Sequence, residues 1–162
     1  PFGNDQNYRY VINGMHHTAH GMPSLTKESI YNSIERINGK IDRNQEDIWE
    51  WEEIDTEDAD ILVVACGCVS RSAIEAVKIA RAKGLKAGLF RPITIWPFIT
   101  DPLEKAMKNA KTVIVPEMNR GQLVHKIKEL AGCDTKVVQL NIFDGTLIMP
   151  EQIAAVIEEA GR

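Results

Sequence analysis

The stretch Ile61-Leu-Val-Val-Ala65 decides the fold that the sequence predicts. It is a continuous apolar run rich in β-branched residues. This is typical of a strand covered on both faces, because a half-exposed strand alternates apolar and polar residues. The turn Cys66-Gly67-Cys68 follows, and Ser72-Ala-Ile-Glu75 has the pattern of a capping box opening a helix that ends at Gly84. We therefore expect a buried strand, a tight turn and a helix.

The alternation of strand and helix continues to the end of the chain. We expect strands over 87–90, 112–115 and 136–140, and helices from 101, over 121–131 and over 150–160. The 101 helix has Asp101 as the expected N-cap and Pro102 at its first position. Strands separated by helices of about ten residues are joined by right-handed crossovers, which give a mainly parallel sheet with helices on both faces. The predicted fold class is α/β, a three-layer α/β/α sandwich.

Residues 60–162 are predicted to form this α/β domain, and residues 1–59 to pack on it as a loop, a helix and an acidic linker. The loop includes a short extended piece at 8–12. Thr26 is the expected N-cap of the helix, whose apolar stripe is Ile30, Ile34, Ile37 and Ile41. Gly39 favours a bend or break in it. The acidic residues over 46–60, with tryptophans among them, favour a solvated linker, and a docking surface for a basic partner is the alternative.

Composition narrows the class of protein. A chain of 162 residues with 44% hydrophobic and 26% charged residues is typical of one globular domain. A net charge of -4 predicts neither nucleic acid nor a membrane surface as partner, and no apolar run approaches the ~20 residues that span a bilayer. Three cysteines suggest no disulfide framework, so we expect a reducing, cytoplasmic location. The start at Pro1 rather than Met is interpreted as a cut from a longer protein.

In an open parallel sheet, ligands gather at the carboxyl ends of the strands, and here those ends lack the phosphate-binding motifs. Neither G-x-G-x-x-G nor G-x-x-x-x-G-K-[ST] occurs, which argues against a Rossmann cofactor site or a P-loop. Cys68 could act as a nucleophile with His125 and Glu117 completing a triad, which leaves a small cysteine hydrolase as one hypothesis. The favoured interpretation is that Cys66 and Cys68 are small, partly buried fillers.

Two further segments stand out. His16, His17 and His20 could bind zinc, but a third or fourth ligand and a fixed geometry are missing, so we favour a loop that bonds locally or faces a partner. Over 91–98, Pro92 and Pro97 cannot donate ladder hydrogen bonds, which predicts a rigid, extended exit from a strand. The large apolar groups of this segment, Trp96 and Phe98, are expected to pack on either the protein's own core or a neighbouring domain.

These motifs, taken in order, resemble the alpha subunit of 2-oxoacid:ferredoxin oxidoreductases. The resemblance is carried by 64–72 (VACGCVSRS), 88–98 (GLFRPITIWPF), 116–123 (PEMNRGQL) and 144–150. In addition, 14–23 (GMHHTAHGMP) is similar to the G-x-x-H-x-x-x-G-x-P loop of the 2-oxoglutarate members. The family usually has proline where Ile99 stands here. The resemblance covers the C-terminal portion of that subunit and implies a transketolase C-terminal-like fold.

The resemblance implies a function for the whole enzyme that this piece does not perform alone. The complete enzyme would decarboxylate a 2-oxoacid oxidatively to an acyl-CoA, with ferredoxin as acceptor. Thiamine diphosphate, Mg²⁺ and iron–sulfur clusters would be bound by other domains of the alpha subunit and by the beta, and possibly gamma and delta, subunits. We expect no cofactor, metal or catalytic residue on this piece. A branched-chain 2-oxoacid or pyruvate enzyme is the alternative. The residues expected to contact neighbouring domains or subunits are His17, Arg91, Trp96, Phe98, Glu117 and Asn119.

Overall fold

The computed structural model describes residues 13–18 and 20–162, so the extended piece predicted at 8–12 lies outside the described residues. The chain forms two compact units, residues 1–47 and residues 48–162. None of the helices in the described part of the chain combines the length and the hydropathy that crossing a bilayer requires.

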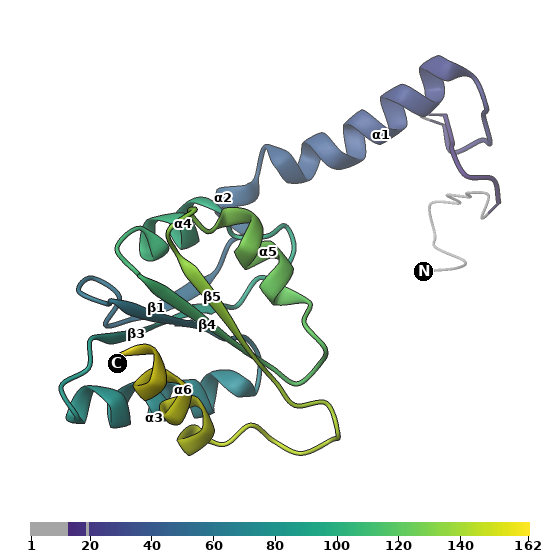
Figure 1. Ribbon diagram of the computed structural model, residues 1–162. Helices are drawn as coiled ribbons and strands as arrows, with labels where there is room; N and C mark the ends of the chain where they lie inside the picture. The colour runs from purple at the N-terminus through teal and green to yellow at the C-terminus, as the bar shows by residue number, and fades with distance from the viewer. Residues whose placement is uncertain (1–12, 19) are drawn as a thin grey trace, which may run out of the picture. The chain divides into compact units, whose positions relative to one another are not determined.

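The second unit is built on one five-stranded sheet (Figure 1). Its strands are β1 (Trp51–Ile54), β2 (Ile61–Val64), β3 (Ala87–Pro92), β4 (Thr112–Glu117) and β5 (Lys136–Asn141). They lie in the order β1-β3-β2-β4-β5. The four strands β2 to β5 are parallel, and β1 is an antiparallel edge strand paired with β3.

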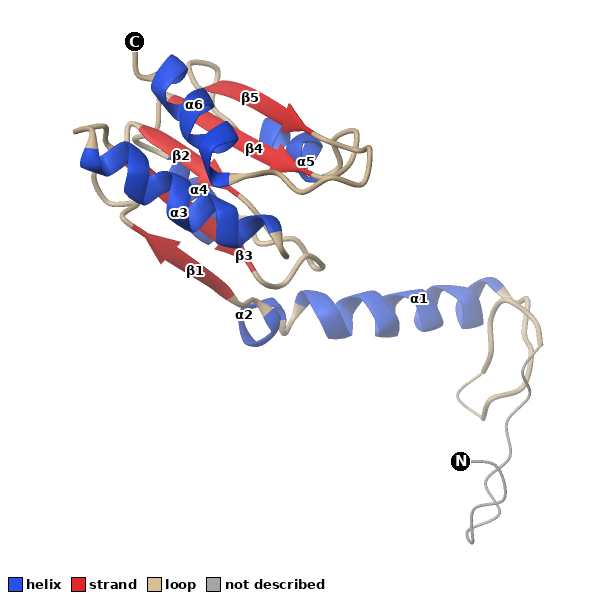
Figure 2. Cartoon of the chain, turned by 90° about the horizontal axis from the view of Figure 1, so that it is seen from below, coloured by secondary structure: helices blue, strands red, loops and turns tan. Residues whose placement is uncertain are grey.

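Helices cover both faces of this sheet, as predicted (Figures 1 and 2). One face carries α3 (Val69–Ala82) and α6 (Pro150–Ala160), and the other carries α4 (Asp101–Met107) and α5 (Leu123–Leu130). Strand β2 is buried throughout: Ile61 and Val63 pack on the α3/α6 side, and Leu62 and Val64 on the α4/α5 side. The three-layer α/β/α prediction is therefore confirmed.

Three predicted helix starts were wrong. Helix α5 begins at Leu123, two residues after the predicted start at 121. Helix α3 begins at Val69, three residues before the predicted capping box, because Gly67 turns the chain in one step with a φ of 60°. Cys68 takes the N-cap position without a side-chain hydrogen bond. Helix α4 has Thr100 before it, and Asp101 is its first residue rather than its cap. The predicted end of α3 is confirmed, since Gly84 follows the C-cap with a φ of 81°.

The acidic stretch contains a strand where the sequence predicted only a linker. After the short helix α2 (Gln45–Ile48), β1 pairs with β3 along its whole length and reaches Pro92, so Pro92 ends a paired strand. Arg91 donates to the Glu52 carboxylate across this pair at 2.8 Å. The Trp49 indole N–H donates to the Pro97 carbonyl at 3.1 Å. Cross-strand pairing with β3 overrides the linker-like composition.

The first unit contains helix α1 (Lys27–Asp42) and the loop before it. The predicted N-cap is confirmed, because Thr26 Oγ1 accepts from the Ser29 N–H at 3.3 Å. The predicted break at Gly39 is wrong, since the helix continues to Asp42. Gly39 is instead covered by Arg43, whose Nη1 would lie 2.6 Å from an added Cβ.

Gly88, in β3, lies against the loop between β1 and β2, so a substitution of Gly88 tests how closely this loop packs on the sheet. A Cβ on Gly88 would lie 2.6 Å from the Asp55 carbonyl oxygen and 3.0 Å from the Ala59 Cβ. Because backbone must move to admit it, we expect Gly88→Ala to lower the free energy of unfolding by about 1–3 kcal/mol in urea titrations. Gly132→Ala is the control, since its nearest contact is Thr135 Oγ1 at 3.8 Å. Equal stabilities of the two variants would contradict the packing described.

Candidate functional site

Three turns meet at the carboxyl edge of the parallel strands, where ligands of open α/β sheets gather. They follow β2, β4 and β5 and comprise residues 66–68, 118–121 and 142–143. The turns after β2 and β4 touch through sulfur, because Cys68 Sγ lies 3.8 Å from Met118 Sδ. The sequence predicted these turns at the carboxyl ends of parallel strands from the alternation of strands and helices, without predicting the strand order.

A buried carboxylate organises the turn after β4. Glu117 is the last residue of β4, and 5% of its surface is exposed. Its carboxylate accepts backbone N–H groups from Gln122 at 3.1 and 3.2 Å, from Leu123 at 2.8 Å and from Val124 at 3.2 Å. These are donors that the first turn of α5 leaves without helical partners. Their partial positive charge compensates the buried anion.

Two asparagines extend this network to β5. Asn119 donates to Glu117 Oε1 at 3.2 Å, and its Oδ1 accepts from the Gly121 N–H at 2.6 Å. Asn141, at the end of β5, donates to the Asn119 carbonyl at 2.8 Å. Gly121 has a φ of 102°, and an added Cβ would lie 3.0 Å from the Gln139 amide nitrogen. Asn141 was not among the predicted contact residues, although its polar side chain at the end of a predicted strand was the available signal.

The proposed triad is not assembled. Within the described residues, His125 makes no hydrogen bond to Cys68 or Glu117, and it lies exposed on α5. The Glu117 oxygens are instead occupied by backbone donors. Cys68 is exposed, whereas Cys66 is half-buried; burial and then the nearby Glu117 carboxylate raise the pKa of the Cys66 thiol. His125 and Glu117 therefore do not act as the base and orienting group of a triad with Cys68 in the described part of the chain.

The segment after β3 divides into an inward and an outward part. Phe98 is half-buried against the α4/α5 core, and Ile99, in place of the proline usual in the resembling family, is completely buried. Trp96 points the other way and is 70% exposed, with Ile93 and Ile95 exposed nearby in the chain. Arg91 is held by Glu52, as described above. Of the predicted contact residues in this segment, Trp96 therefore has the most free surface.

The His17 loop belongs to the first unit and is held by its own backbone. Gly14 and Gly21 have φ values of 76° and 78°, and His17 forms an isolated bridge with Pro23. His17 Nε2 lies 2.7 Å from the Asn13 carbonyl oxygen, a local bond of the kind expected from the sequence. Over residues 13–18 and 20–162, no group of three or more His, Cys, Asp or Glu side chains is placed to hold a metal ion.

Fold and site together define a three-layer α/β domain whose polar groups at the carboxyl edge bond to one another. The family model for pyruvate:ferredoxin oxidoreductase core domain II matches residues 59–153. The chain therefore belongs to the pyruvate:ferredoxin oxidoreductase core domain II family, which confirms the resemblance found in the sequence.

Individual relatives agree with this assignment. The chain is 34% identical over 152 residues to 2-oxoglutarate synthase subunit KorA of Methanocaldococcus jannaschii, covering 94% of this chain and 41% of the relative. It is 42% identical over 110 residues to ketoisovalerate oxidoreductase subunit VorB of Methanothermobacter marburgensis, covering 67% of this chain and 31% of the relative. The chain thus spans less than half the length of the curated relatives it matches.

Solved structures agree on the fold. A 2-oxoglutarate:ferredoxin oxidoreductase from Magnetococcus marinus, with 2-oxoglutarate, coenzyme A and succinyl-CoA bound, matches 99% of this chain and 28% of its own. The TM-score is 0.85 at 24% identity. A split-gene transketolase, an inactive β4 tetramer, matches 70% of this chain and 42% of its own, with a TM-score of 0.59 at 20% identity. The transketolase-like part of the fold prediction is confirmed.

The hydrogen bonds of Glu117 predict how its substitution changes the free energy of unfolding. Glu117→Gln replaces one carboxylate oxygen by an NH₂ group that faces N–H donors, so we expect a loss of about 2 kcal/mol in the free energy of unfolding. Glu129→Gln is the control, because Glu129 is exposed on the same helix and bonds only Lys126. Its effect should stay within about 0.5 kcal/mol. Equal losses in the two variants would contradict the capping role.

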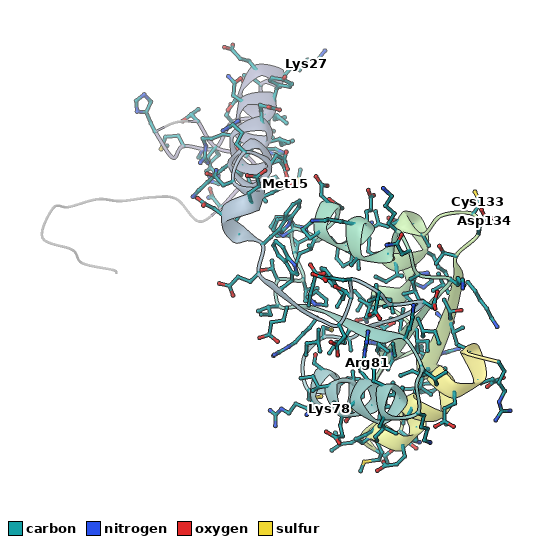
Figure 3. The ribbon with its side chains drawn as sticks, turned by 90° about the vertical axis from the view of Figure 1, so that its left-hand side faces the viewer. Met15, Lys27, Lys78, Arg81, Cys133 and Asp134 are labelled. Carbon is teal, nitrogen blue, oxygen red and sulfur yellow. The ribbon has the colours of Figure 1, made fainter. Side chains whose placement is uncertain are left out.

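The different burial of Cys66 and Cys68 predicts different rates of alkylation. The thiolate is the reactive form, so the raised pKa and burial of Cys66 should slow its alkylation at neutral pH. We expect Cys66 to react with iodoacetamide roughly tenfold or more slowly than the exposed Cys68, measured by fragment-ion mass spectrometry of the tryptic peptide 44–71, which contains both cysteines. Cys133, in the exposed turn before β5 (Figure 3), is the internal reference. A thiolate at Cys68 forming well below the pKa of about 8.5 of free cysteine would instead favour the nucleophile hypothesis.

Proposed function

We propose that this chain is the core domain II portion of the alpha subunit of a 2-oxoglutarate:ferredoxin oxidoreductase. The whole enzyme would convert a 2-oxoacid and coenzyme A to an acyl-CoA and CO₂, passing electrons to ferredoxin. The observation that carries this proposal is the extent of the match to 2-oxoglutarate synthase subunits. It covers 94% and 96% of this chain in the two relatives from Methanocaldococcus jannaschii and Methanothermobacter thermautotrophicus.

Within that enzyme the chain would organise contacts rather than carry out the reaction. The polar groups at the carboxyl edge bond one another, as the Glu117 and Asn119 hydrogen bonds illustrate. We infer that thiamine diphosphate and Mg²⁺ would be held elsewhere; in support, the sequence contains neither G-x-G-x-x-G nor G-x-x-x-x-G-K-[ST], and over residues 13–18 and 20–162 no three His, Cys, Asp or Glu side chains are grouped to hold a metal. Other domains of the alpha subunit and the beta, and possibly gamma and delta, subunits would bind thiamine diphosphate, Mg²⁺ and the iron–sulfur clusters.

The predicted contact residues divide into two roles under this proposal. Trp96 would insert into a neighbouring domain, because a large aromatic group that is 70% exposed is the type of residue that anchors interfaces. Arg91 and Phe98 would hold the Trp96 segment in place, and Glu117 and Asn119 would hold the turn after β4. His17, in the first unit, would contact a neighbour through its loop.

A branched-chain 2-oxoacid enzyme is the second candidate. The identity to the ketoisovalerate oxidoreductase subunit is 42%, higher than the 34% to the 2-oxoglutarate synthase subunit, but over 67% rather than 94% of this chain. A pyruvate synthase subunit of Methanosarcina barkeri is 33% identical over 116 residues, so pyruvate is a further alternative. The wider coverage favours 2-oxoglutarate.

Activity assays separate these possibilities. The purified 162-residue chain, given thiamine diphosphate, Mg²⁺, coenzyme A and methyl viologen, should show no 2-oxoacid-dependent reduction of the dye, because under this proposal other domains and subunits hold the cofactor. The control is the complex reconstituted with the remaining domains and subunits, which should reduce the dye fastest with 2-oxoglutarate. A preference for 2-oxoisovalerate or pyruvate would select an alternative, and turnover by the isolated chain would overturn the proposal.

A further inference from the structure

Two Asn-Gly pairs occur in the chain, Asn13-Gly14 and Asn38-Gly39, and both lie in the first unit. Asparagine is one of the chemically labile residues of proteins. It loses its side-chain amide when the backbone nitrogen of the following residue attacks the side-chain amide carbon. A following glycine favours this attack, because it has no side chain to obstruct its nitrogen and adopts conformations that other residues avoid. The two pairs share this chemistry, but the structure gives them different surroundings.

The pair Asn38-Gly39 is held by helix α1. Gly39 is buried inside this helix, where each backbone N–H is directed at the carbonyl four residues earlier. The Asn38 side-chain amide donates to the Ile34 carbonyl at 3.0 Å. The nitrogen and the amide carbon that would have to meet are therefore both restrained. Attack at this pair requires the helix to open locally first.

The pair Asn13-Gly14 lies in the loop before α1, outside any helix or strand. Gly14 has a φ of 76°, in the left-handed region that favours glycine. Among residues 13–18 and 20–162, no backbone carbonyl accepts a hydrogen bond from the Gly14 N–H. The nitrogen that would attack is therefore not engaged in a helical hydrogen bond, as the nitrogen of a residue inside α1 is.

His17 places a hydrogen-bond donor on the peptide group that would react. Its Nε2 lies 2.7 Å from the Asn13 carbonyl oxygen, and because a carbonyl only accepts, Nε2 is the donor. This carbonyl and the Gly14 nitrogen belong to one resonant peptide group, so the negative charge formed when the nitrogen loses its proton is shared with the oxygen. A donor aimed at developing charge lowers the barrier. The His17 carbonyl accepts from the Ser29 hydroxyl of α1 at 3.4 Å, which helps to hold His17 in place.

We propose that Asn13 is a self-modification site, converted to aspartate and isoaspartate with His17 as the catalytic residue. Hydroxide removes the Gly14 N–H proton, and the nitrogen electron pair forms a bond to Asn13 Cγ. The Cγ–Nδ2 bond breaks, and the leaving nitrogen takes a proton from water to give ammonia and return the hydroxide. Water then opens the resulting succinimide at either carbonyl, giving aspartate or isoaspartate. The product places a carboxylate beside His17, and the proposal does not depend on the 2-oxoacid activity.

Timed incubation of the 162-residue chain at mildly alkaline pH tests the site. Cleavage after lysine at mildly acid pH gives the peptides 1–27 and 28–40, and fragment-ion mass spectrometry locates the lost amide in each. Asn13 should deamidate roughly tenfold or more faster than Asn38, which reacts only from a locally opened helix. His17→Ala should slow the reaction at Asn13 roughly fivefold or more, because it removes the donor. His20→Ala, which changes an exposed histidine of the same loop, is the matched control and should leave the rate unchanged.

A further measurement separates the placement of His17 from its mere presence in the sequence. In concentrated urea the loop is not formed, so His17→Ala should no longer change the rate at Asn13. An equal effect of the substitution in urea and in buffer would overturn the proposal. It would also be overturned by an Asn13 that reacts no faster than Asn38, or by an unchanged or faster rate in His17→Ala. Circular dichroism of each variant checks that the fold is retained.

Discussion

The burial of β2 is the constraint on which the rest of the second unit depends. Its four side chains are all buried, and its backbone is paired with β3 on one side and β4 on the other. A strand with apolar side chains on both faces requires cover on both faces, and parallel neighbours require crossover connections long enough to provide it. Helices α3 and α4 supply that cover on opposite faces. Parallel strands also end at one edge, which brings the turns after β2, β4 and β5 together.

At that edge, one buried anion determines how the chain continues. An unpaired carboxylate in the core would be strongly destabilising, so Glu117 is tolerated only because the start of α5 turns its N–H groups toward it. This arrangement fixes where α5 begins and which direction the 118–121 turn takes. Arg120 is consequently directed away from the core and rests on Phe143. The hydrogen bonds of the buried Glu117 thus help to place Arg120 beside Phe143 on the exposed surface.

The sequence predicted the layers of the fold because they depend on local apolar runs and turn residues, such as 61–65 and Gly84. It missed β1, whose exposed side chains resemble a solvated linker and whose pairing with β3 involves residues about forty positions away. The sequence predicted Glu117 and Asn119 as contacts to a neighbour, which stays a prediction. It did not predict that Glu117 accepts the first N–H groups of α5, because a sequence does not tell which way a side chain at the end of a strand points. The approach of Arg120 to Phe143 likewise depends on β4 and β5 being neighbours.

The two exposed apolar surfaces of the second unit are distinct because the sheet order separates them. Trp96 follows β3, and the exposed Phe143 and Leu147 follow β5. The ends of β2 and β4 lie between them. Three strand spacings of about 4.8 Å place the ends of β3 and β5 roughly 14 Å apart. The intervening turns carry Cys68 and the polar Glu117–Asn119 network rather than a continuous apolar strip. Because a polar break separates the two apolar surfaces, each can be covered independently of the other.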